Sequence, residues 1–411
     1  MPLEFSQLLE QVDTMGRALA HRNASAAEKV KLAMQSLAES CDLDPIRARI
    51  ERVRQSNISG YRGATPLDEP ICGPYPGQPE PEQAILTAVD GSQVYPDPHG
   101  QTLYYLTNIG RFQYCSGLPY PPEPFTHPEL VYHDSKLQDR DGRMITNQTV
   151  NARRTLLEMQ ALAETGWAYY QQAQETGQWT PVALLHDGNL LKVFGANEVA
   201  DAAKIEAGYL RALQQIRDSG ALLAGYVDRP RGSSLISLLH LLHLPDDGIT
   251  ETALRSNGEL EGVTDEMLFR RILRPGERSA LLALNSPQNR EYKQHDDDLE
   301  IAFFYVNVAL PDEGPKIARV DVPMSVARNP ARVNFLHGLL LAQCAIQGRK
   351  RYPYVLTRAD ELAYVNGQDR AQLDELIRIA MLQNDLAAEQ SNKLQTKGLA
   401  RGERRQHRLR A

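Results

Sequence analysis

Cysteine is scarce in this chain, and long apolar runs are missing from it. The chain has four cysteines, Cys41, Cys72, Cys115 and Cys344, which are far apart and show no paired metal spacing, as fits a reducing cytoplasm. We expect them to be separate core thiols of a cytoplasmic protein. No apolar stretch approaches the length that a bilayer requires. The N-terminus also lacks the basic start and apolar block of a signal peptide, so we expect a soluble protein without a membrane partner.

An excess of positive charge is also absent, because the formal net charge is −7. This balance argues against a protein that coats nucleic acid through bulk charge. Basic residues gather locally instead: the stretch Lys397 to Arg410 is strongly basic, and a second group lies between Arg229 and Arg278. The C-terminal stretch is either a solvated end or an arm that follows a phosphate backbone.

What is present indicates a globular chain, with 42% hydrophobic residues, divided into four segments. Residues 1–63 show helical apolar spacing and form an N-terminal helical arm. Residues 64–82 hold so many prolines that we expect a linker there. Residues 83–365 form one long domain with insertions, and residues 366–411 form a long helix that leads into the basic tail.

The order of elements within the long domain predicts its fold. Apolar periodicity predicts strands at 83–89, 102–114 and 129–132, a helix at 149–172, a strand at 182–185, a helix at 200–219 and a strand at 221–227. This is the chain order of a ribonuclease H-like domain, in which parallel strands extend an antiparallel meander through helical crossovers. We therefore predict an α/β fold with a mixed sheet flanked by helices. A last strand is expected at Tyr352–Leu356.

Two short apolar runs each end on aspartate and glycine, at Asp90-Gly91 and at Asp187-Gly188. Because glycine ends a strand, both carboxylates should lie at strand ends, where chains expose chemistry. Carboxylate oxygens suit Mg²⁺ or Mn²⁺, so the pair predicts metal-assisted phosphodiester hydrolysis. The alternative is that both are ordinary turn residues, since Asp-Gly is common in loops.

In ribonuclease H-like nucleases a helix-borne glutamate joins the two strand aspartates at the metal. The helix at 149–172 offers Glu158, with Glu164 as a competitor. Either glutamate could instead be a solvated helix residue.

The chain resembles the NurA family of nucleases from about Ile85 to Val365. The shared motifs, in chain order, are Ala88-Val-Asp90-Gly-Ser92, Arg154-x-x-x-Glu158, Leu185-His-Asp187-Gly188, Gly225-Tyr-Val, Arg319-Val-Asp321-Val-Pro323 and Tyr352-Pro-Tyr-Val-Leu-x-Arg358-Ala-Asp360-Glu361. The resemblance implies a manganese-dependent DNA nuclease, dimeric, that processes DNA ends beside a hexameric HerA-type ATPase. Single-strand endonuclease and 5′ to 3′ exonuclease activities are also implied.

One position departs from the family pattern. The family usually has a histidine of the metal site where this chain has Asp360. Aspartate can also bind Mn²⁺, so Asp360 or Glu361 would complete the metal site, and Asp321 is either a further site residue or a salt-bridge partner. Four arginines are expected to contact DNA: Arg229, Arg231, Arg319 and Arg358.

Two other functions stay open at this point. The change at Asp360 could mark an inactive adaptor that binds DNA ends and an ATPase. A ribonuclease H-like enzyme that acts on RNA also fits the sequence, because sugar discrimination depends on shape and 2′-hydroxyl contacts.

Overall fold

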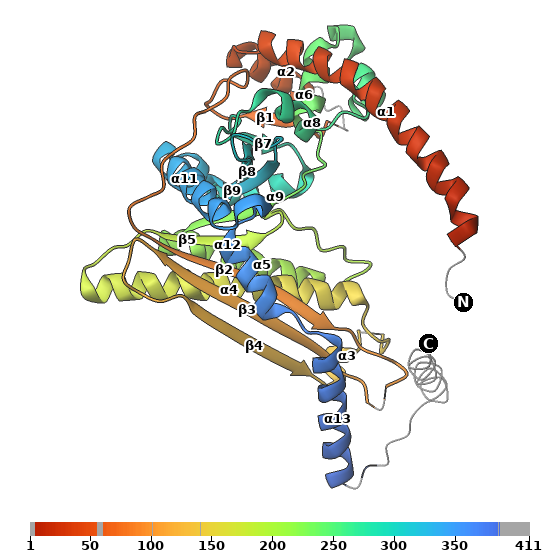
Figure 1. The fold of residues 1–411 in the computed structure, drawn as a ribbon, viewed down its shortest axis with the longest axis vertical. Helices are drawn as coiled ribbons and strands as arrows, with labels where there is room; N and C mark the ends of the chain where they lie inside the picture. The colour runs from red at the N-terminus through yellow and green to blue at the C-terminus, as the bar shows by residue number, and fades with distance from the viewer. Residues whose placement is uncertain (1–4, 56–60, 101, 140, 385, 387–411) are drawn as a thin grey trace. The chain divides into compact units, whose positions relative to one another are not determined.

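Figure 1 shows the computed structural model of the chain, which describes residues 5–55, 61–100, 102–139, 141–384 and 386. The chain divides into two compact units. Unit 1 holds residues 1–82, 187–192 and 222–354, and unit 2 holds residues 83–186, 193–221 and 355–411. Each unit is therefore assembled from separate stretches of sequence. The basic stretch Lys397–Arg410 lies outside the described residues.

Unit 2 is built on a mixed sheet. Its strands, in spatial order, are β5 (Val182–Asp187), β2 (Ala84–Val94), β3 (Tyr105–Ser116) and β4 (Glu123–Val131). The strands β2, β3 and β4 form an antiparallel meander, whereas β5 pairs with β2 in parallel. The long connection from β4 to β5 contains α4 (Asn147–Thr176), which is the crossover that a parallel pair requires. This arrangement confirms the predicted α/β, ribonuclease H-like mixed sheet flanked by helices.

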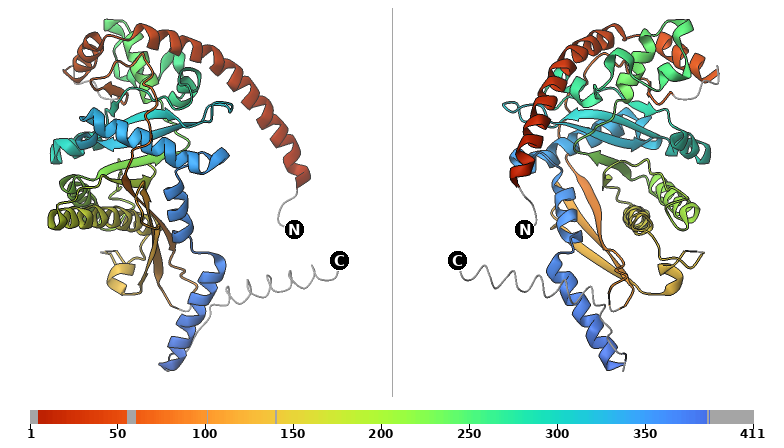
Figure 2. Two further views of the ribbon diagram at one scale, coloured as in Figure 1. Left: turned by 60° about the vertical axis from the view of Figure 1, so that its left-hand side comes forward. Right: turned by 90° about the vertical axis from the view of Figure 1, so that its right-hand side faces the viewer.

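Helix α4 packs between this sheet and α5 (Ala202–Ser219), as Figure 2 shows. It begins at the cap Thr146, whose side chain accepts the Thr149 N–H at 3.1 Å, and it ends at Gly177 with φ of 70°. Its buried residues include Met159 and Leu162, at the spacing that predicted the helix. The short helix α3 (Asp134–Leu137) precedes it.

The predicted strand at Tyr352–Leu356 is wrong, because the chain enters the helix α12 (Tyr354–Ala363) there. Val355, Leu356, Ala359 and Ala363 are buried, and this spacing is that of one helix face. A short β-branched and aromatic run does not distinguish a strand from the start of a buried helix. The helix α13 (Gly367–Gln383) follows behind a capping box at Asn366 and confirms a C-terminal helix in that region.

Unit 1 contains an antiparallel sheet. Its strands, in spatial order, are β1 (Ala64–Pro66), β7 (Leu282–Leu284), β8 (Ile301–Asn307), β9 (Ile317–Pro323) and β6 (Leu222–Val227). Its helices are α1 (Phe5–Glu39), α2 (Leu43–Gln55), α6 (Ser234–His243), α7 (Glu251–Leu254), α8 (Asp265–Ile272), α9 (Pro287–His295), α10 (Met324–Ala327) and α11 (Pro330–Ile346). The core joins α2, α6 and α8 to the strands β7 and β8.

Only the second half of α1 belongs to this core. Val30, Ala33 and Leu37 are buried in it, whereas the side chains of Phe5 and Leu9 are 73% and 70% exposed. Figures 1 and 2 show the first half of the helix extending away from the other elements of unit 1. The predicted helical arm is therefore present, and part of it packs as an integral element of unit 1.

The proline-rich segment 64–82 is packed and does not behave as a linker. β1 pairs with β7, and the backbone N–H of Tyr75 donates to the Arg278 carbonyl at 2.8 Å. The Glu69 carboxylate accepts from both terminal nitrogens of Arg278, at 2.7 and 2.8 Å. Prolines exclude regular elements but leave carbonyls and side chains to fix an extended chain.

The prediction of four separate thiols is also wrong. Cys41, between α1 and α2, forms a disulfide with Cys72 in the proline-rich segment, whereas Cys115 and Cys344 are free and buried. The spacing of 31 residues gave no signal, because the pair is brought together by the packing of segment 64–82.

Within the described part of the chain, none of the helices combines the length and the apolar character that crossing a membrane would require.

Candidate functional site

Asp90 and Asp187 occupy equivalent places on neighbouring strands. The parallel register of β2 and β5 ends with Val89 beside His186. The next residue along each strand is an aspartate, Asp90 on β2 and Asp187 at the end of β5. Residues in register on parallel strands point to the same face of the sheet. The two Asp-Gly sequences therefore mark equivalent positions on a parallel pair.

Only one of the two strands ends at its Asp-Gly sequence. β5 ends at Asp187, and Gly188 follows with φ of 98°, as a turn requires. β2 instead continues through Gly91 to Val94, paired with β3 along its whole length. The prediction that Asp90 ends a strand is therefore wrong, and Gly91 needs another explanation.

Gly91 makes room for a helix side chain. A Cβ atom at this position would lie 2.6 Å from Oε1 of Glu158 and 2.8 Å from Cγ of Arg154, and both distances are shorter than real Cβ contacts. On the strand itself, the Gly91 N–H donates to Oδ1 of Asp90 at 2.8 Å. Glu158 therefore reaches Gly91 from the α4 side of β2, whereas the preceding residue, Asp90, points to the opposite face of the strand.

One face of α4 carries the residues that meet β2. Asn151, Arg154 and Glu158 are three and four residues apart, so they project from the same side of the helix. Arg154 donates to the Gly91 carbonyl at 3.0 Å and to Oε1 of Gln93 at 2.9 Å. Asn151 accepts from the hydroxyl of Tyr95 at 2.7 Å. These contacts fix the rotation of α4 about its axis.

This rotation separates the two candidate glutamates. Glu158 is 3% exposed and faces Gly91, whereas Glu164 is exposed. The structure therefore places Glu158, and not Glu164, against β2 at Gly91, on the face of the sheet opposite to the one to which Asp90 points.

From the sequence, Arg154 and His186 were identified only as parts of motifs, and no contact of either with Glu158 was predicted. Nε of Arg154 lies 3.0 Å from Glu158 Oε1, and Nδ1 of the buried His186 lies 4.0 Å from Glu158 Oε2. Both could have been found from the pattern. Arg154 precedes Glu158 by one helical turn, and His186 precedes Asp187, so it points to the opposite face of β5.

Asp360 and Glu361 lie on α12 and are exposed. The helix α12 packs closely against Gly110 of β3. A Cβ atom on Gly110 would lie 2.5 Å from the Ala359 carbonyl oxygen, so only glycine allows this approach. Gly110 is paired with Asp90, so α12 covers the face of the sheet to which Asp90 points. Arg358 forms an ion pair with Glu361, and its guanidinium lies 5.7 Å from the ring centre of Phe112.

Arg319 and Asp321 form a buried pair on β9. The Asp321 carboxylate is fully buried, accepts from Nε of Arg319 at 2.7 Å and accepts the Leu190 N–H at 3.2 Å. Burial disfavours the guanidinium charge, but Asp321 and Tyr305 hold the pKa of Arg319 above its usual value. The guanidinium also stacks 3.9 Å from the centre of the Phe303 ring. These contacts bury Asp321 and leave the Arg319 side chain 14% exposed.

Arg229 and Arg231 lie on the loop that follows β6 and are exposed. The loop is anchored by the buried Asp265 at the start of α8. Its carboxylate accepts the N–H groups of Leu235 and Ile236 at 3.1 and 3.0 Å, and its own N–H donates to the Gly232 carbonyl at 2.9 Å. Asp265 thus supplies the cap that the Ser233 side chain does not give to α6.

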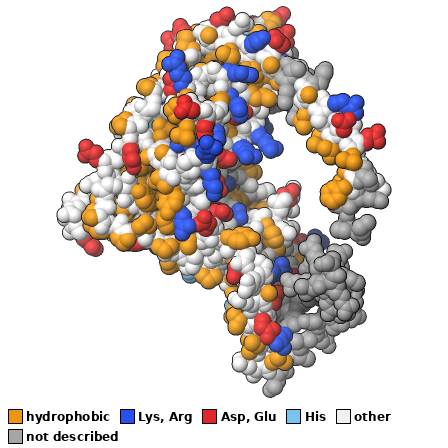
Figure 3. All heavy atoms as spheres, viewed as in Figure 1, with side chains coloured by type: hydrophobic (Ala, Val, Ile, Leu, Met, Phe, Trp, Pro, Cys, Tyr) orange, Lys and Arg blue, Asp and Glu red, His pale blue; other side chains and the backbone are white. Residues whose placement is uncertain are grey.

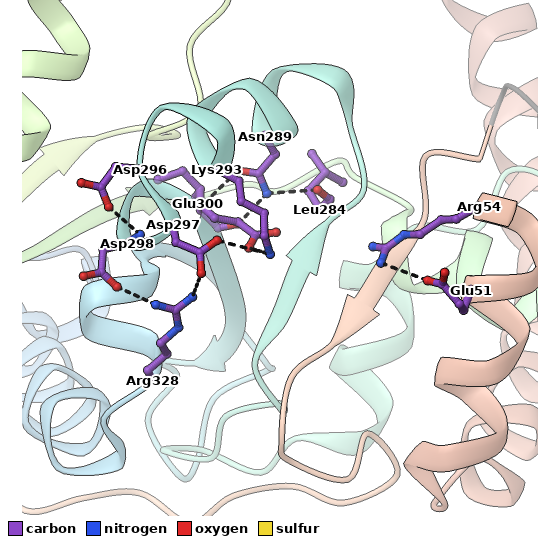
Figure 4. Close-up of polar contacts among 11 residues, drawn as sticks. Glu51, Arg54, Leu284, Asn289, Lys293, Asp296, Asp297, Asp298, Glu300 and Arg328 are labelled. Atoms are coloured by element: carbon purple, nitrogen blue, oxygen red, sulfur yellow. Dashed lines mark hydrogen bonds and ion pairs between the residues drawn. The ribbon is translucent and has the colours of Figure 1, made fainter. Parts of the chain in front are cut away.

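An acidic run at Asp296–Asp298 is neutralised locally. Figure 4 shows Arg328 directed at the carboxylates of Asp297 and Asp298, and Lys293 directed at Asp297 and Glu300. The nitrogen–oxygen distances from Arg328 are 2.9 and 2.6 Å. This cluster is therefore a set of ion pairs and not a free set of metal ligands.

The donors around Gly91 are carboxylates, the ligand type that a hard divalent cation prefers, but they do not form a complete metal site. Among the residues that the structure describes, no three His, Cys, Asp or Glu side chains converge as a self-sufficient metal site. Mg²⁺ and Mn²⁺ keep several waters and are often held by one or two carboxylates together with substrate phosphates. Asp90 and Glu158 each offer one carboxylate, from opposite faces of β2.

Comparison with known proteins found two similar solved structures and one matching family model. The crystal structure of the NurA nuclease from Sulfolobus solfataricus is similar, with 12% sequence identity and a TM-score of 0.46, over 90% of this chain and 98% of that one. The catalytic domain of human endonuclease V is similar at 13% identity and a TM-score of 0.30, over 82% of this chain and 97% of that one. Comparison with curated proteins gave no match. The family model described as the NurA domain matches residues 85–365, and the chain therefore belongs to the NurA family.

Proposed function

We propose that this chain is a metal-dependent nuclease that hydrolyses phosphodiester bonds of DNA. Membership of the NurA family supports a DNA nuclease. The observation that carries the proposed site is the register of β2 and β5, which is followed on each strand by an aspartate. An aspartate at both equivalent positions is the arrangement that two-strand metal sites need, whereas two unrelated turn residues would have no reason to share a register.

Asp90, Glu158 and Asp187 are the proposed metal-binding carboxylates, with Asp360 and Glu361 as further ligands. When bound, Mn²⁺ or Mg²⁺ would lower the pKa of a water ligand and stabilise charge on the leaving oxygen. Arg154 holds Glu158 against β2 and neutralises its buried charge. Nδ1 of the buried His186 lies 4.0 Å from the second oxygen of Glu158. The proposed DNA contacts are Arg229, Arg231, Arg319 and Arg358.

The finer activities come from the resemblance to the family. We propose a preference for Mn²⁺, single-strand endonuclease and 5′ to 3′ exonuclease activity, a homodimer, and the processing of DNA ends in the cytoplasm with a HerA-type hexameric ATPase. A chain with a net charge of −7 should bind DNA weakly on its own, because it neutralises few phosphates. An ATPase that threads DNA toward it would raise the local concentration of the strand.

The test uses one preparation of the full chain on matched, labelled DNA and RNA strands, with Mn²⁺, Mg²⁺ or EDTA. Cleavage of DNA with either metal, and none in EDTA, is the expected result. Asp90→Asn, Asp187→Asn and Glu158→Gln should each abolish cleavage, whereas Glu164→Gln, on the exposed side of α4, should cleave as the unaltered chain does. Manganese affinity measured by calorimetry, together with a urea unfolding curve for each variant, separates loss of the metal from loss of folding.

The same experiment distinguishes the two other functions. DNA binding without cleavage under any condition would identify a non-catalytic adaptor. The presence of an exposed aspartate, Asp360, where the family has a histidine favours this alternative. Cleavage of RNA in preference to DNA would identify an RNA nuclease. Full activity in Asp90→Asn would remove the proposed site altogether.

A further inference from the structure

Unit 1 contains a cavity whose rim is strongly basic. It has a volume of about 480 Å³ and lies between the loop after β6, the helix α8 and the start of β9. Five cationic side chains line it: Arg229, Arg231, Arg270, Lys316 and Lys350. The acids in the lining are Asp228 and Glu266. In a chain of net charge −7, five positive groups against two negative ones are a local excess that needs a reason.

Part of this positive charge is not used within the protein. Arg270 pairs with Glu266 at 3.1 Å, Lys316 with Glu313 at 3.6 Å, and Arg229 lies 3.7 Å from Asp228. Arg231 and Lys350 form no ion pair with any residue in the described ranges. Figure 3 shows several Lys and Arg side chains over the elements of unit 1 on the face that it presents. The cavity therefore offers two cations for an external anion.

The cationic loop is held in place by buried polar contacts. Asp265 accepts the first N–H groups of α6, and the hydroxyl of the buried Tyr305 donates to its Oδ2 at 2.8 Å. The Asp265 N–H donates to the carbonyl of Gly232, one residue after Arg231. Asp265 is itself the first residue of α8, which carries Arg270. One buried carboxylate thus fixes the backbone of both cationic elements with respect to each other.

The uncharged part of the lining indicates what kind of anion fits. Pro230, Met267 and Ile317 give the cavity an aliphatic wall, and none of the described lining residues is aromatic. Aromatic side chains are the usual platforms on which proteins stack bases, whereas an aliphatic wall with arginine and lysine suits a sugar-phosphate backbone.

We infer that this cavity is a DNA-backbone site of unit 1, in which Arg231 and Lys350 bind the phosphates of a single strand without regard to sequence. The inference rests on the proposed function only for the identity of the polyanion as DNA. It adds Lys350, Arg270 and Lys316 to the two arginines that the sequence singled out. These residues position the strand and take no part in the chemistry.

The experiment measures binding of a labelled 20-nucleotide DNA strand to the full chain by fluorescence anisotropy in EDTA, so cleavage plays no role. The double variant Arg231→Gln and Lys350→Gln should weaken binding about tenfold and reduce the slope of log Kd against log salt by about 1.4, or about 0.7 for each phosphate that is no longer neutralised. The matched control is Arg255→Gln with Lys293→Gln, which removes the same charge from ion-paired positions outside the cavity.

An unchanged slope in the cavity variant, or an equal loss in the control, overturns the inference. Strands of different sequence should bind within about twofold of one another, since phosphate contacts carry no sequence information. Displacement of the strand by polyglutamate at the same charge concentration would also overturn it, because the cavity would then be an unselective anion site. If the unaltered chain binds the strand as expected but does not cleave DNA when metal is added, the proposed nuclease activity is contradicted. The assignment of the cavity as a DNA-backbone site is not affected by that result.

Discussion

The guanidinium of Arg154 lies one helical turn before the carboxylate of Glu158, with 3.0 Å between Nε and Oε1. The carboxylate is 4% exposed, and the guanidinium also donates to the Gly91 carbonyl on β2. Arg154 therefore does two things at once, because it neutralises a buried acid and ties the helix to the strand that carries Asp90.

The stability of this pair can be measured by a double-mutant cycle. Arg154→Met leaves the Glu158 charge buried without its partner, so we expect a loss of about 3 kcal/mol in the free energy of unfolding, measured in urea without metal. Adding Glu158→Leu should recover part of the loss, with a coupling energy of about 1 to 3 kcal/mol. The control cycle pairs Arg154→Met with Glu164→Leu, which lies on the exposed side of the same helix and should be additive. Additivity in both cycles would contradict the ion pair.

Gly91→Ala tests the close approach of α4 to β2. The added Cβ would lie 2.6 Å from Glu158 Oε1, so the glutamate and Arg154 must both move. We expect a loss of about 1 to 3 kcal/mol in stability, together with a loss of metal affinity measured by calorimetry. Gly195→Ala in the same unit is the control, because no atom lies within 4 Å of its added Cβ. Equal behaviour of the two variants would show that Gly91 is only a strand residue.

The pH dependence of stability should carry a contribution from His337 on α11. Burial, and then the charge of Arg278, lower the pKa of this fully buried imidazole to about 4, while Nε2 donates to the Gly276 carbonyl at 2.8 Å. The folded state therefore binds the proton less well than the unfolded state, whose pKa is about 6.5. Stability is fully present above pH 6.5 and is lost as the pH falls toward 4.

Between pH 7 and pH 4.5 the unaltered chain should lose about 2 to 3 kcal/mol more than His337→Gln, measured by urea unfolding at each pH. The exposed His295 on α9 provides the control, since His295→Gln should leave the pH dependence as it is. If the stability of His337→Gln depends on pH as that of the unaltered chain does, the acid sensitivity comes from other groups.

The elements predicted correctly were those with a strong local pattern. α4 has a cap, a helical apolar face and a terminal glycine, and the strand that ends in Asp187 has a continuous apolar run and a turn. Such features are decided by neighbours in sequence, so they can be predicted without the fold.

The errors concern residues whose role depends on a distant partner. Gly91 was predicted to end a strand. In the structure this position needs glycine because Glu158 of α4 lies where a Cβ atom would be. The salt bridge of Arg319 with Asp321 was one of the alternatives left open, but the stacking of Arg319 on Phe303 comes only from the fold. The proline-rich segment was predicted to be a linker, but its Glu69 forms an ion pair with Arg278 and helps to fix it within unit 1. A single sequence without its fold does not reveal these partners.

The disulfide between Cys41 and Cys72 gives the last prediction. It closes a loop across a sequence separation of 31 residues and ties the helical arm to the proline-rich segment. Loop closure of this length is expected to contribute about 3 to 4 kcal/mol to stability by restricting the unfolded chain. Reduction with dithiothreitol should therefore destabilise the unaltered chain and leave a Cys41→Ser, Cys72→Ser variant unaffected. In unreduced, denatured protein only the thiols of Cys115 and Cys344 should react with a thiol reagent. Reaction at all four cysteines would show that the arm is held by packing alone, and the expected effect of reduction would vanish with it.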